Sequence, residues 1–161
     1  MGYRYSAEKN SSNIFQDYLV DKLGDEFEHF GVYQDYCEPM SKLSLGITEL
    51  LSISLGVQIS HFREFFDKNE SIMRLNYYPS CQKPYLTLGT WPHCDPTSLT
   101  ILHQDQVGGL QVFFDNEWRS ISPNLKVFVV KIGETFKPLS NMRYKSCLHC
   151  AVVNRHTIRK S

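Results

Sequence analysis

The clearest signal in the sequence is Trp91-Pro92-His93-Cys94-Asp95-Pro96-Thr97-Ser98-Leu99-Thr100. In an extended segment side chains alternate between faces, so we expect His93 and Asp95 to project to the same side and Cys94 to point away. Two imidazoles and one carboxylate, with further positions left open, are the ligand set of non-haem Fe(II) oxygenases. We predict that His149, from a distant strand, supplies the second imidazole.

The sequence around this signal has the pattern of many short strands separated by turns. Apolar or alternating runs are bounded by glycine, proline, asparagine and serine, which are typical of turns. This pattern favours a sandwich or barrel over a parallel α/β sheet. The expected strands cover residues 72–78, 86–90, 98–103, 110–114, 118–121, 127–132 and 146–153.

The first part of the chain has the helical spacing of apolar residues instead. One helix is expected to begin near Ile14, and a short one to cover residues 61–67. Between them, a helix from about Tyr36 to Leu55 has Gly56 placed to end it, and Pro39 implies that this helix starts or bends there. The whole pattern predicts an α+β fold, in which N-terminal helices precede a double-stranded β-helix, or jelly roll.

Composition argues against several classes of partner. A chain of 161 residues with 42% hydrophobic residues suits a globular domain with one core. Lys plus Arg and Asp plus Glu both total 17, so no net charge favours nucleic acid or an anionic membrane. There is no apolar run of about 18 residues and no apolar stretch of a secretory signal at the N-terminus. We therefore expect a cytoplasmic protein.

Three other patterns compete with the predicted site or extend it. Five cysteines, an odd number, indicate reduced thiols, and Cys147 and Cys150 of an extended stretch would face opposite sides and chelate poorly. His103-Gln104-Asp105 repeats the His-x-Asp pattern, but a packed or hydrogen-bonded histidine near a strand end is the simpler interpretation. Arg159 and Ser161 share a face of an extended segment and could hold a carboxylate, although a solvated basic tail is the simpler interpretation.

Several stretches, taken in their order and spacing, resemble one family over essentially the whole chain. They are Arg4-Tyr5-Ser6-Ala7-Glu8-Lys9-Asn10, Met40-Ser41-Lys42-Leu43, Arg74-Leu75-Asn76-Tyr77-Tyr78-Pro79, residues 93–105, Val107-Gly108-Gly109-Leu110-Gln111-Val112, Asn116-Glu117-Trp118, Tyr144-Lys145-Ser146-Cys147-Leu148-His149 and Arg159-Lys160-Ser161. The family is that of the plant 2-oxoglutarate- and Fe(II)-dependent dioxygenases, and within it the chain is most similar to the gibberellin 20-oxidases.

The resemblance implies an activity, its cofactors and a role for each site residue. The expected reaction is the oxidation of a gibberellin precursor at carbon-20, with 2-oxoglutarate and O2 as co-substrates of Fe(II) and with release of succinate and CO2. The expected protein is a monomer that acts on this small molecule and binds neither nucleic acid nor membrane. By the same resemblance the metal ligands are His93, Asp95 and His149, and the residues that bind 2-oxoglutarate are Arg159, Ser161, Tyr78 and Asn76.

The chain also departs from this family. Family members are longer, so we interpret the chain as a truncated or divergent copy, with a helical N-terminal segment at residues 1–70 and a C-terminally incomplete jelly-roll core at residues 71–161 in one structural unit. Trp91 and Met142 stand where the family usually has glycine, and Cys150 where it commonly has arginine. If the turn at Met142 needs a positive φ, methionine is strained there. Two alternatives remain: a catalytically impaired or vestigial jelly roll that binds metal or a small molecule without turnover, and a cupin-like metal enzyme of other specificity.

Overall fold

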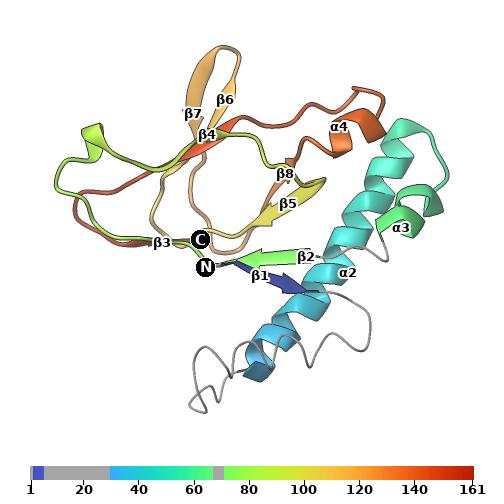
Figure 1. Cartoon of the computed structure of the whole chain (residues 1–161), viewed down its shortest axis with the longest axis horizontal. Coiled ribbons are helices and arrows are strands. Elements are labelled where there is room, and N and C mark those ends of the chain that lie inside the picture. Colours follow the sequence, from blue (N-terminus) through green and yellow to red (C-terminus); the bar gives the residue numbers. More distant parts are fainter. Residues whose placement is uncertain (1, 6–29, 67–70) are drawn as a thin grey trace. The chain divides into compact units, whose positions relative to one another are not determined.

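The computed structural model describes residues 2–5, 30–66 and 71–161 (Figure 1). The chain divides into two compact units, residues 1–74 and residues 75–161. The helix expected to begin near Ile14 lies outside the described residues. None of the helices in the described ranges is long and apolar enough to cross a bilayer.

The first unit contains two helices and a two-stranded sheet. Helix α3 (Ser60–Phe66) lies close to its predicted range. Helix α2 (Phe30–Leu55) ends where predicted but begins earlier than the predicted start near Tyr36, and it continues through Pro39 rather than starting there. Gly56 ends α2 as predicted, because its φ of 73° is left-handed and its N–H bonds back to the carbonyl of Ile53 at 3.1 Å. Strand β1 (Gly2–Tyr5), which the sequence pattern did not predict, pairs antiparallel with β2 (Ser71–Arg74).

The second unit is built from short antiparallel strands, as predicted. The expected strand over residues 72–78 is split between the units, and the expected strand after residue 86 begins later and extends to His93. The elements of this unit are β3 (Tyr77–Tyr78), the 3-10 helix η1 (Pro84–Leu86), β4 (Leu88–His93), β5 (Leu99–Leu102), β6 (Leu110–Phe114), β7 (Glu117–Ser120), β8 (Val129–Ile132), α4 (Phe136–Leu139), β9 (His149–Val152) and β10 (Arg159–Lys160).

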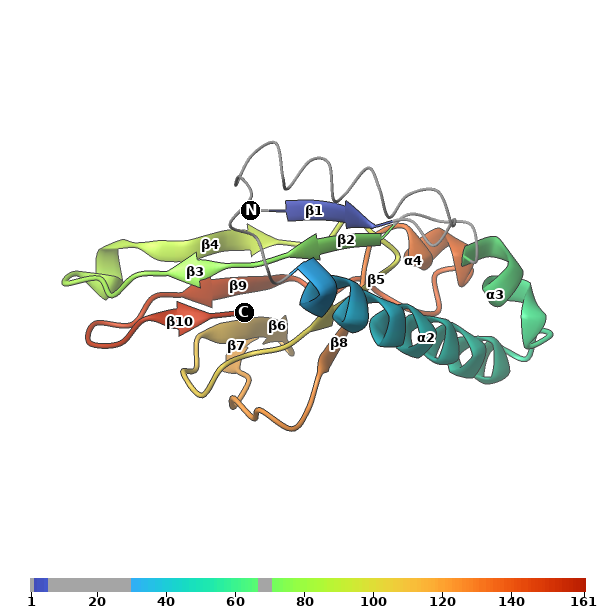
Figure 2. The ribbon, with the colours of Figure 1, turned by 90° about the horizontal axis from the view of Figure 1, so that it is seen from below.

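Strand pairing in this unit has the crossed order of a jelly roll. One sheet has the order β4-β9-β6-β7, so β9 lies between two strands that precede it in the sequence (Figure 2). Strands β5 and β8 form a second sheet, and β10 pairs with β3. Buried side chains in this unit include Leu110 on β6, Phe136 on α4, and Cys150 and Ala151 on β9. The prediction of an α+β fold with a jelly-roll core is confirmed.

Tight turns and close approaches fix the strand connections. Asp115 and Asn116 both have positive φ, 53° and 62°, and form the two-residue turn between β6 and β7. Asn141 and Met142 also have positive φ, 50° and 65°. The turn at Met142 therefore has the backbone conformation in which methionine is expected to be strained.

Candidate metal centre

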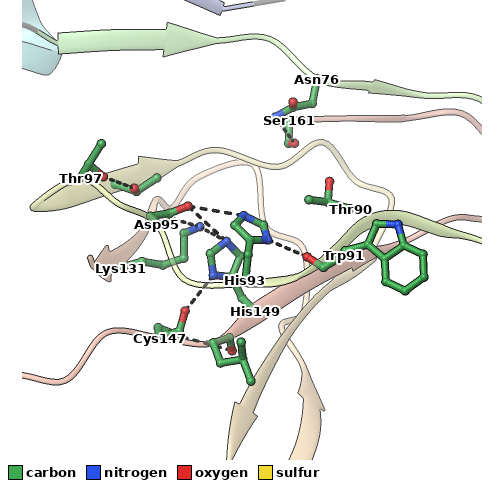
Figure 3. A network of polar contacts seen from close by, with 12 residues as sticks. Asn76, Thr90, Trp91, His93, Asp95, Thr97, Lys131, Cys147, His149 and Ser161 are labelled. Carbon is green, nitrogen blue, oxygen red and sulfur yellow. Dashed lines mark hydrogen bonds and ion pairs between the residues drawn. The ribbon is translucent and has the colours of Figure 1, made fainter. Parts of the chain in front are cut away.

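His93, Asp95 and His149 converge on one point in the second unit. Each offers one ligand atom, and these atoms all lie within 4.8 Å of one another (Figure 3). The Nε2 atoms of His93 and His149 are 3.6 Å and 3.5 Å from Oδ1 of Asp95. Within residues 2–5, 30–66 and 71–161, this is the one such cluster of histidine, cysteine and acidic side chains.

Strand pairing brings the two histidines together. His93 is the last residue of β4, His149 is the first residue of β9, and the two are cross-strand partners in the antiparallel sheet. Their ring centroids are consequently 4.3 Å apart. His93 and His149 are 56 positions apart in the sequence. They are in direct contact because β9 pairs antiparallel with β4 at the end of β4 where His93 lies.

Asp95 reaches the centre in a different way from the one expected. Strand β4 ends at His93, so Asp95 lies in the following loop and not on the same extended segment. Residues just after β8 hold this loop by its backbone: the N–H of Glu134 donates to the carbonyl of Asp95 at 2.8 Å, and the hydroxyl of Thr135 donates to the carbonyl of Pro96 at 2.6 Å. The carboxylate is therefore positioned by a loop-to-loop contact and not by strand alternation.

Gly133 permits that contact. A Cβ atom on Gly133 would lie 1.9 Å from the carbonyl oxygen of Thr97 and 2.8 Å from that of Asp95. No side chain fits at such distances, because both neighbours are backbone atoms that cannot rotate away. Glycine is required here for the close approach of two backbone segments, one of which carries Asp95.

Backbone carbonyls orient both imidazoles. Nδ1 of His93 lies 2.6 Å from the carbonyl oxygen of Trp91, and Nδ1 of His149 lies 2.8 Å from that of Cys147. A carbonyl only accepts, so each Nδ1 carries a proton and donates it, and Nε2 is the ring nitrogen that faces the centre. Hydrogen bonds of this kind fix the ring orientation and tautomer of metal-ligating histidines. The donor set therefore fits a divalent transition metal ion.

Trp91 contributes its backbone and not its side chain to this arrangement. The indole is 78% exposed and points away from the two imidazoles (Figure 3). The bulky side chain beside the first histidine therefore does not enter the centre. Its carbonyl, which any residue at this position would provide, is the group that bonds His93.

A lysine that the sequence analysis did not select also enters the centre. The Nζ atom of Lys131, on β8, lies 2.6 Å from Nε2 of His149 and 2.8 Å from Oδ2 of Asp95. The side chain of Lys131 is only 4% exposed. One sequence feature could have identified this lysine: it is a charged residue within an apolar run, Val127-Phe128-Val129-Val130-Lys131-Ile132. Strand alternation places Lys131 on the same, inward face as Val129.

The lysine contact sets the electrostatics of the centre. Burial alone would raise the pKa of Asp95, but the contacts with Lys131 and the Thr100 hydroxyl and the lysine charge outweigh it, so the pKa of Asp95 is lowered. Burial and the charge of Lys131 lower the pKa of His149, despite its bond to the Cys147 carbonyl. The Nζ atom of Lys131, 2.8 Å from Oδ2 of Asp95, forms a buried ion pair with this carboxylate.

A second buried cation lies at the C-terminal strand. Arg159 on β10 is 1% exposed, so the interpretation as a solvated tail does not apply to it. Its guanidinium carbon lies 4.8 Å from the centroid of the Tyr78 ring, and Nη2 donates to Oε1 of Gln104 at 3.4 Å. Its Nε and Nη1 atoms are buried without a hydrogen-bond acceptor. Gly109 makes room for this side chain, because a Cβ there would lie 2.9 Å from Cδ of Arg159.

The other residues expected to bind 2-oxoglutarate lie near the same strand ends. Asn76 and Ser161 exchange two backbone hydrogen bonds, at 2.7 Å and 3.1 Å, and Nδ2 of Asn76 donates to the Ser161 hydroxyl at 3.5 Å. The hydroxyl of Tyr78 lies 3.1 Å from that of Thr90. The structure thus joins Arg159 to Tyr78 and Asn76 to Ser161, through the pairing of β10 with β3 and its continuation.

The competing patterns do not form metal sites. His103, which follows β5, bonds the carbonyl of Leu125 through Nε2 at 3.0 Å and packs against the ring of Phe128, as expected for a histidine near a strand end. Cys147 and Cys150 are free, and burial raises the pKa of both thiols. A buried thiol with a raised pKa is a poor nucleophile and a poor ligand.

Comparison with known sequences points to one family. Residues 69–161 match the sequence model of the 2OG-Fe(II) oxygenase superfamily. Gibberellin 20 oxidase 2 of Arabidopsis thaliana is 64% identical over 162 residues, which cover 100% of this chain and 43% of that protein. Gibberellin 20 oxidase 1-D of Triticum aestivum is 63% identical over 146 residues, covering 90% of this chain and 40% of that protein. The chain therefore spans less than half the length of these curated relatives.

Comparison with solved structures agrees. The crystal structure of JOX2 in complex with 2OG, Fe and JA has a TM-score of 0.84 and 36% identity, and the match covers 99% of this chain and 47% of that one. AtDAO1, a dioxygenase for auxin oxidation from Arabidopsis thaliana in complex with 2-oxoglutarate, has a TM-score of 0.80 and 23% identity, with 99% and 60% of the two chains covered. At that lower identity the likeness supports the fold alone.

Proposed function

This chain belongs to the 2OG-Fe(II) oxygenase superfamily, and from this premise we propose that it serves the 2-oxoglutarate- and Fe(II)-dependent oxidation of a gibberellin precursor at carbon-20, with release of succinate and CO2. The cofactor pair follows from the family. The substrate class follows from relatives that are 64% and 63% identical and are named gibberellin 20 oxidases.

The observation that carries the proposal is the convergence of His93, Asp95 and His149. Both imidazoles direct Nε2 toward the Asp95 carboxylate, whose pKa is lowered, and the pKa of His149 is lowered as well, which favours the deprotonated forms of these two groups that a metal ligand needs. We assign these three residues as the Fe(II) ligands.

Arg159 supports the co-substrate assignment. A buried guanidinium with two nitrogen atoms that lack an acceptor is costly unless an anion completes it. A carboxylate of 2-oxoglutarate would accept from such a fork with charge-assisted hydrogen bonds. Tyr78, which packs on the guanidinium, and the joined pair Asn76 and Ser161 would border this carboxylate.

Bound Fe(II), with 2-oxoglutarate and O2, supplies the oxidising power for the substrate. The residues of this chain do the remaining work. His93, Asp95 and His149 would hold the metal, Arg159 would orient 2-oxoglutarate by its far carboxylate, and the carbonyls of Trp91 and Cys147 keep both imidazoles fixed.

The test is anaerobic Fe(II) titration followed by measurement of succinate released from 2-oxoglutarate, with and without a gibberellin precursor. We expect wild type and the exposed-site control His156→Ala to bind Fe(II) and release succinate, and His149→Ala to do neither. Equal Fe(II) binding by His149→Ala would refute the ligand assignment. Succinate release that no gibberellin precursor stimulates would refute the substrate class.

A second candidate function has one specific observation in its favour. The Lys131 ammonium already contacts two of the three metal ligands, which favours a jelly roll that binds a small molecule without turnover. Gibberellin binding without succinate formation would identify this case.

We further propose that the protein is a cytoplasmic monomer with no nucleic-acid or membrane partner. The balanced charge of 17 basic and 17 acidic residues supports the absence of such partners. Light scattering that reports a dimer would contradict the monomer.

A further inference from the structure

Lys131 connects the metal centre to a second sheet. Its strand β8 pairs with β5 over four residues, with Lys131 opposite Thr100, while His93 and His149 belong to the sheet of β4 and β9. The side chain spans the space between the sheets and ends between Asp95 and His149 (Figure 3). A buried lysine normally has a specific partner, and these two proposed metal ligands are the partners of this one.

We propose that Lys131 is a built-in competitor of the metal ion, which holds Asp95 and His149 in place when no metal is bound and must leave the centre before a metal binds. This inference rests on the proposed function, since it concerns the same three ligands. It adds a residue that controls metal loading and that has no part in holding the metal.

The competition follows from the lone pairs that the lysine uses. His149 donates its Nδ1 proton to the Cys147 carbonyl, so its Nε2 has one lone pair, and the Lys131 nitrogen at 2.6 Å donates a proton to it. A metal ion bound by His149 would need that same lone pair. Lys131 and a metal ion therefore cannot occupy His149 together, whatever the remaining ligands do.

Charge acts in the same direction. The ammonium nitrogen, 2.8 Å from Oδ2 of Asp95, supplies the positive charge that this half-buried carboxylate would otherwise receive from a metal. A divalent ion placed beside a retained ammonium would be repelled by it in a region of low dielectric constant. The backbone of Lys131 is fixed by the pairing of β8 with β5, so only the side chain can leave the centre. On leaving, it loses the ion pair with Asp95, its only charged partner among the described residues.

Mn(II) titration by calorimetry tests this directly, because Mn(II) needs neither O2 nor turnover. The variant Lys131→Met keeps the length of the side chain and removes its donor and charge. Lys126→Met, at an exposed lysine near the start of the same strand, is the matched control. We expect the dissociation constant of Lys131→Met to fall at least about tenfold below that of wild type, a difference of about 1.4 kcal/mol, and that of Lys126→Met to stay unchanged.

A second readout covers the metal-free protein. We expect Lys131→Met to unfold at a lower temperature than wild type without metal and to gain more from added Mn(II), since the metal replaces the missing cation. Should Lys131→Met not fold, Lys131→Gln, which keeps a neutral donor, gives the same comparison with a smaller expected gain.

The outcomes separate this inference from the proposed function. Equal or weaker Mn(II) binding by both Lys131 variants, with wild type binding, would overturn the competitor role and leave the metal site intact. Absence of binding in wild type and in both Lys131 variants would overturn both, because removing the lysine would have opened no site.

Discussion

Replacing Arg159 tests the co-substrate site most sharply. The side chain is 1% exposed, and its Nε and Nη1 have no acceptor among the described residues. Arg159→Met keeps an unbranched apolar stem against the Tyr78 ring and removes every donor. Arg155→Met is the matched control, because Arg155 lies four residues earlier on the exposed surface.

The size of the effect follows from the two unpaired nitrogen atoms. A hydrogen bond to a charged group contributes about 1.5–3 kcal/mol, so a carboxylate that accepts from both would gain about 3–6 kcal/mol. At about 1.4 kcal/mol per factor of ten, the loss in affinity for 2-oxoglutarate should be about a hundredfold to ten-thousandfold. The bond from Nη2 to Gln104, at 3.4 Å, is long and adds little to this difference.

Without 2-oxoglutarate the same variant should lose little stability. It loses the Gln104 bond and the contact of the cation with Tyr78, and it also removes the cost of burying a charge without an anion. These terms oppose each other. The expected signature is therefore a protein that unfolds near the wild-type temperature and no longer gains stability from 2-oxoglutarate.

The assay is calorimetric titration of 2-oxoglutarate in the presence of Mn(II), together with thermal unfolding with and without 2-oxoglutarate. Wild type and Arg155→Met should bind 2-oxoglutarate and unfold at a higher temperature when it is present. The reasoning would be refuted if Arg159→Met bound within about threefold of wild type, a difference below about 1 kcal/mol. It would also be refuted if wild type failed to bind 2-oxoglutarate.

Two further predictions concern the backbone conformation of the second unit. Met142 has a φ of 65° and is 58% exposed. The substitution Met142→Gly should relieve about 1–2 kcal/mol of strain in the left-handed conformation. The greater conformational freedom of glycine in the unfolded chain should offset about 0.4–1 kcal/mol of this gain in the free energy of unfolding. Urea unfolding should show a net gain, and a lower midpoint would contradict the strain. Gly133→Ala should lower stability by at least about 3 kcal/mol and weaken Mn(II) binding, because its Cβ would displace the loop that carries Asp95. Gly46→Ala, where nothing lies within 4 Å of the added Cβ, is the control and should lose neither property.

The sequence was sufficient to predict which three side chains form the candidate metal centre, but not how the backbone positions Asp95. His93 and Asp95 were selected by residue type and spacing and His149 by the family resemblance, and the structure brings the three together. The expected reason, alternation along one extended segment, applies only up to His93, where β4 ends. Asp95 depends on Gly133 and Glu134, which are 38 and 39 positions away, and a contact between two loops leaves no periodic pattern in the sequence.

Turn chemistry was predictable where a residue type has a strong backbone preference. Gly56 at the end of α2 and the Asp115-Asn116 turn adopt the left-handed conformations that these residues favour. The strain at Met142 could be stated only as a condition, because the sequence alone does not give φ. Strand β1, Gly-Tyr-Arg-Tyr, was missed because an alternation of two tyrosines about one arginine is too short to distinguish a strand from a loop.

The two buried cations of the second unit show why pairing, and not burial, decides what a charged group does. Lys131 and Arg159 are 5% and 1% exposed, and both lie on strands whose backbone is fixed by a neighbour. Lys131 has an anion, Asp95, and therefore uses up a binding position, whereas Arg159 has no anion in the described part of the chain and leaves one open. The same residue class thus weakens binding of a cation at one site and favours binding of an anion at the other. A variant that removes the lysine should strengthen metal binding, and one that removes the arginine should weaken 2-oxoglutarate binding, although both delete a buried positive charge.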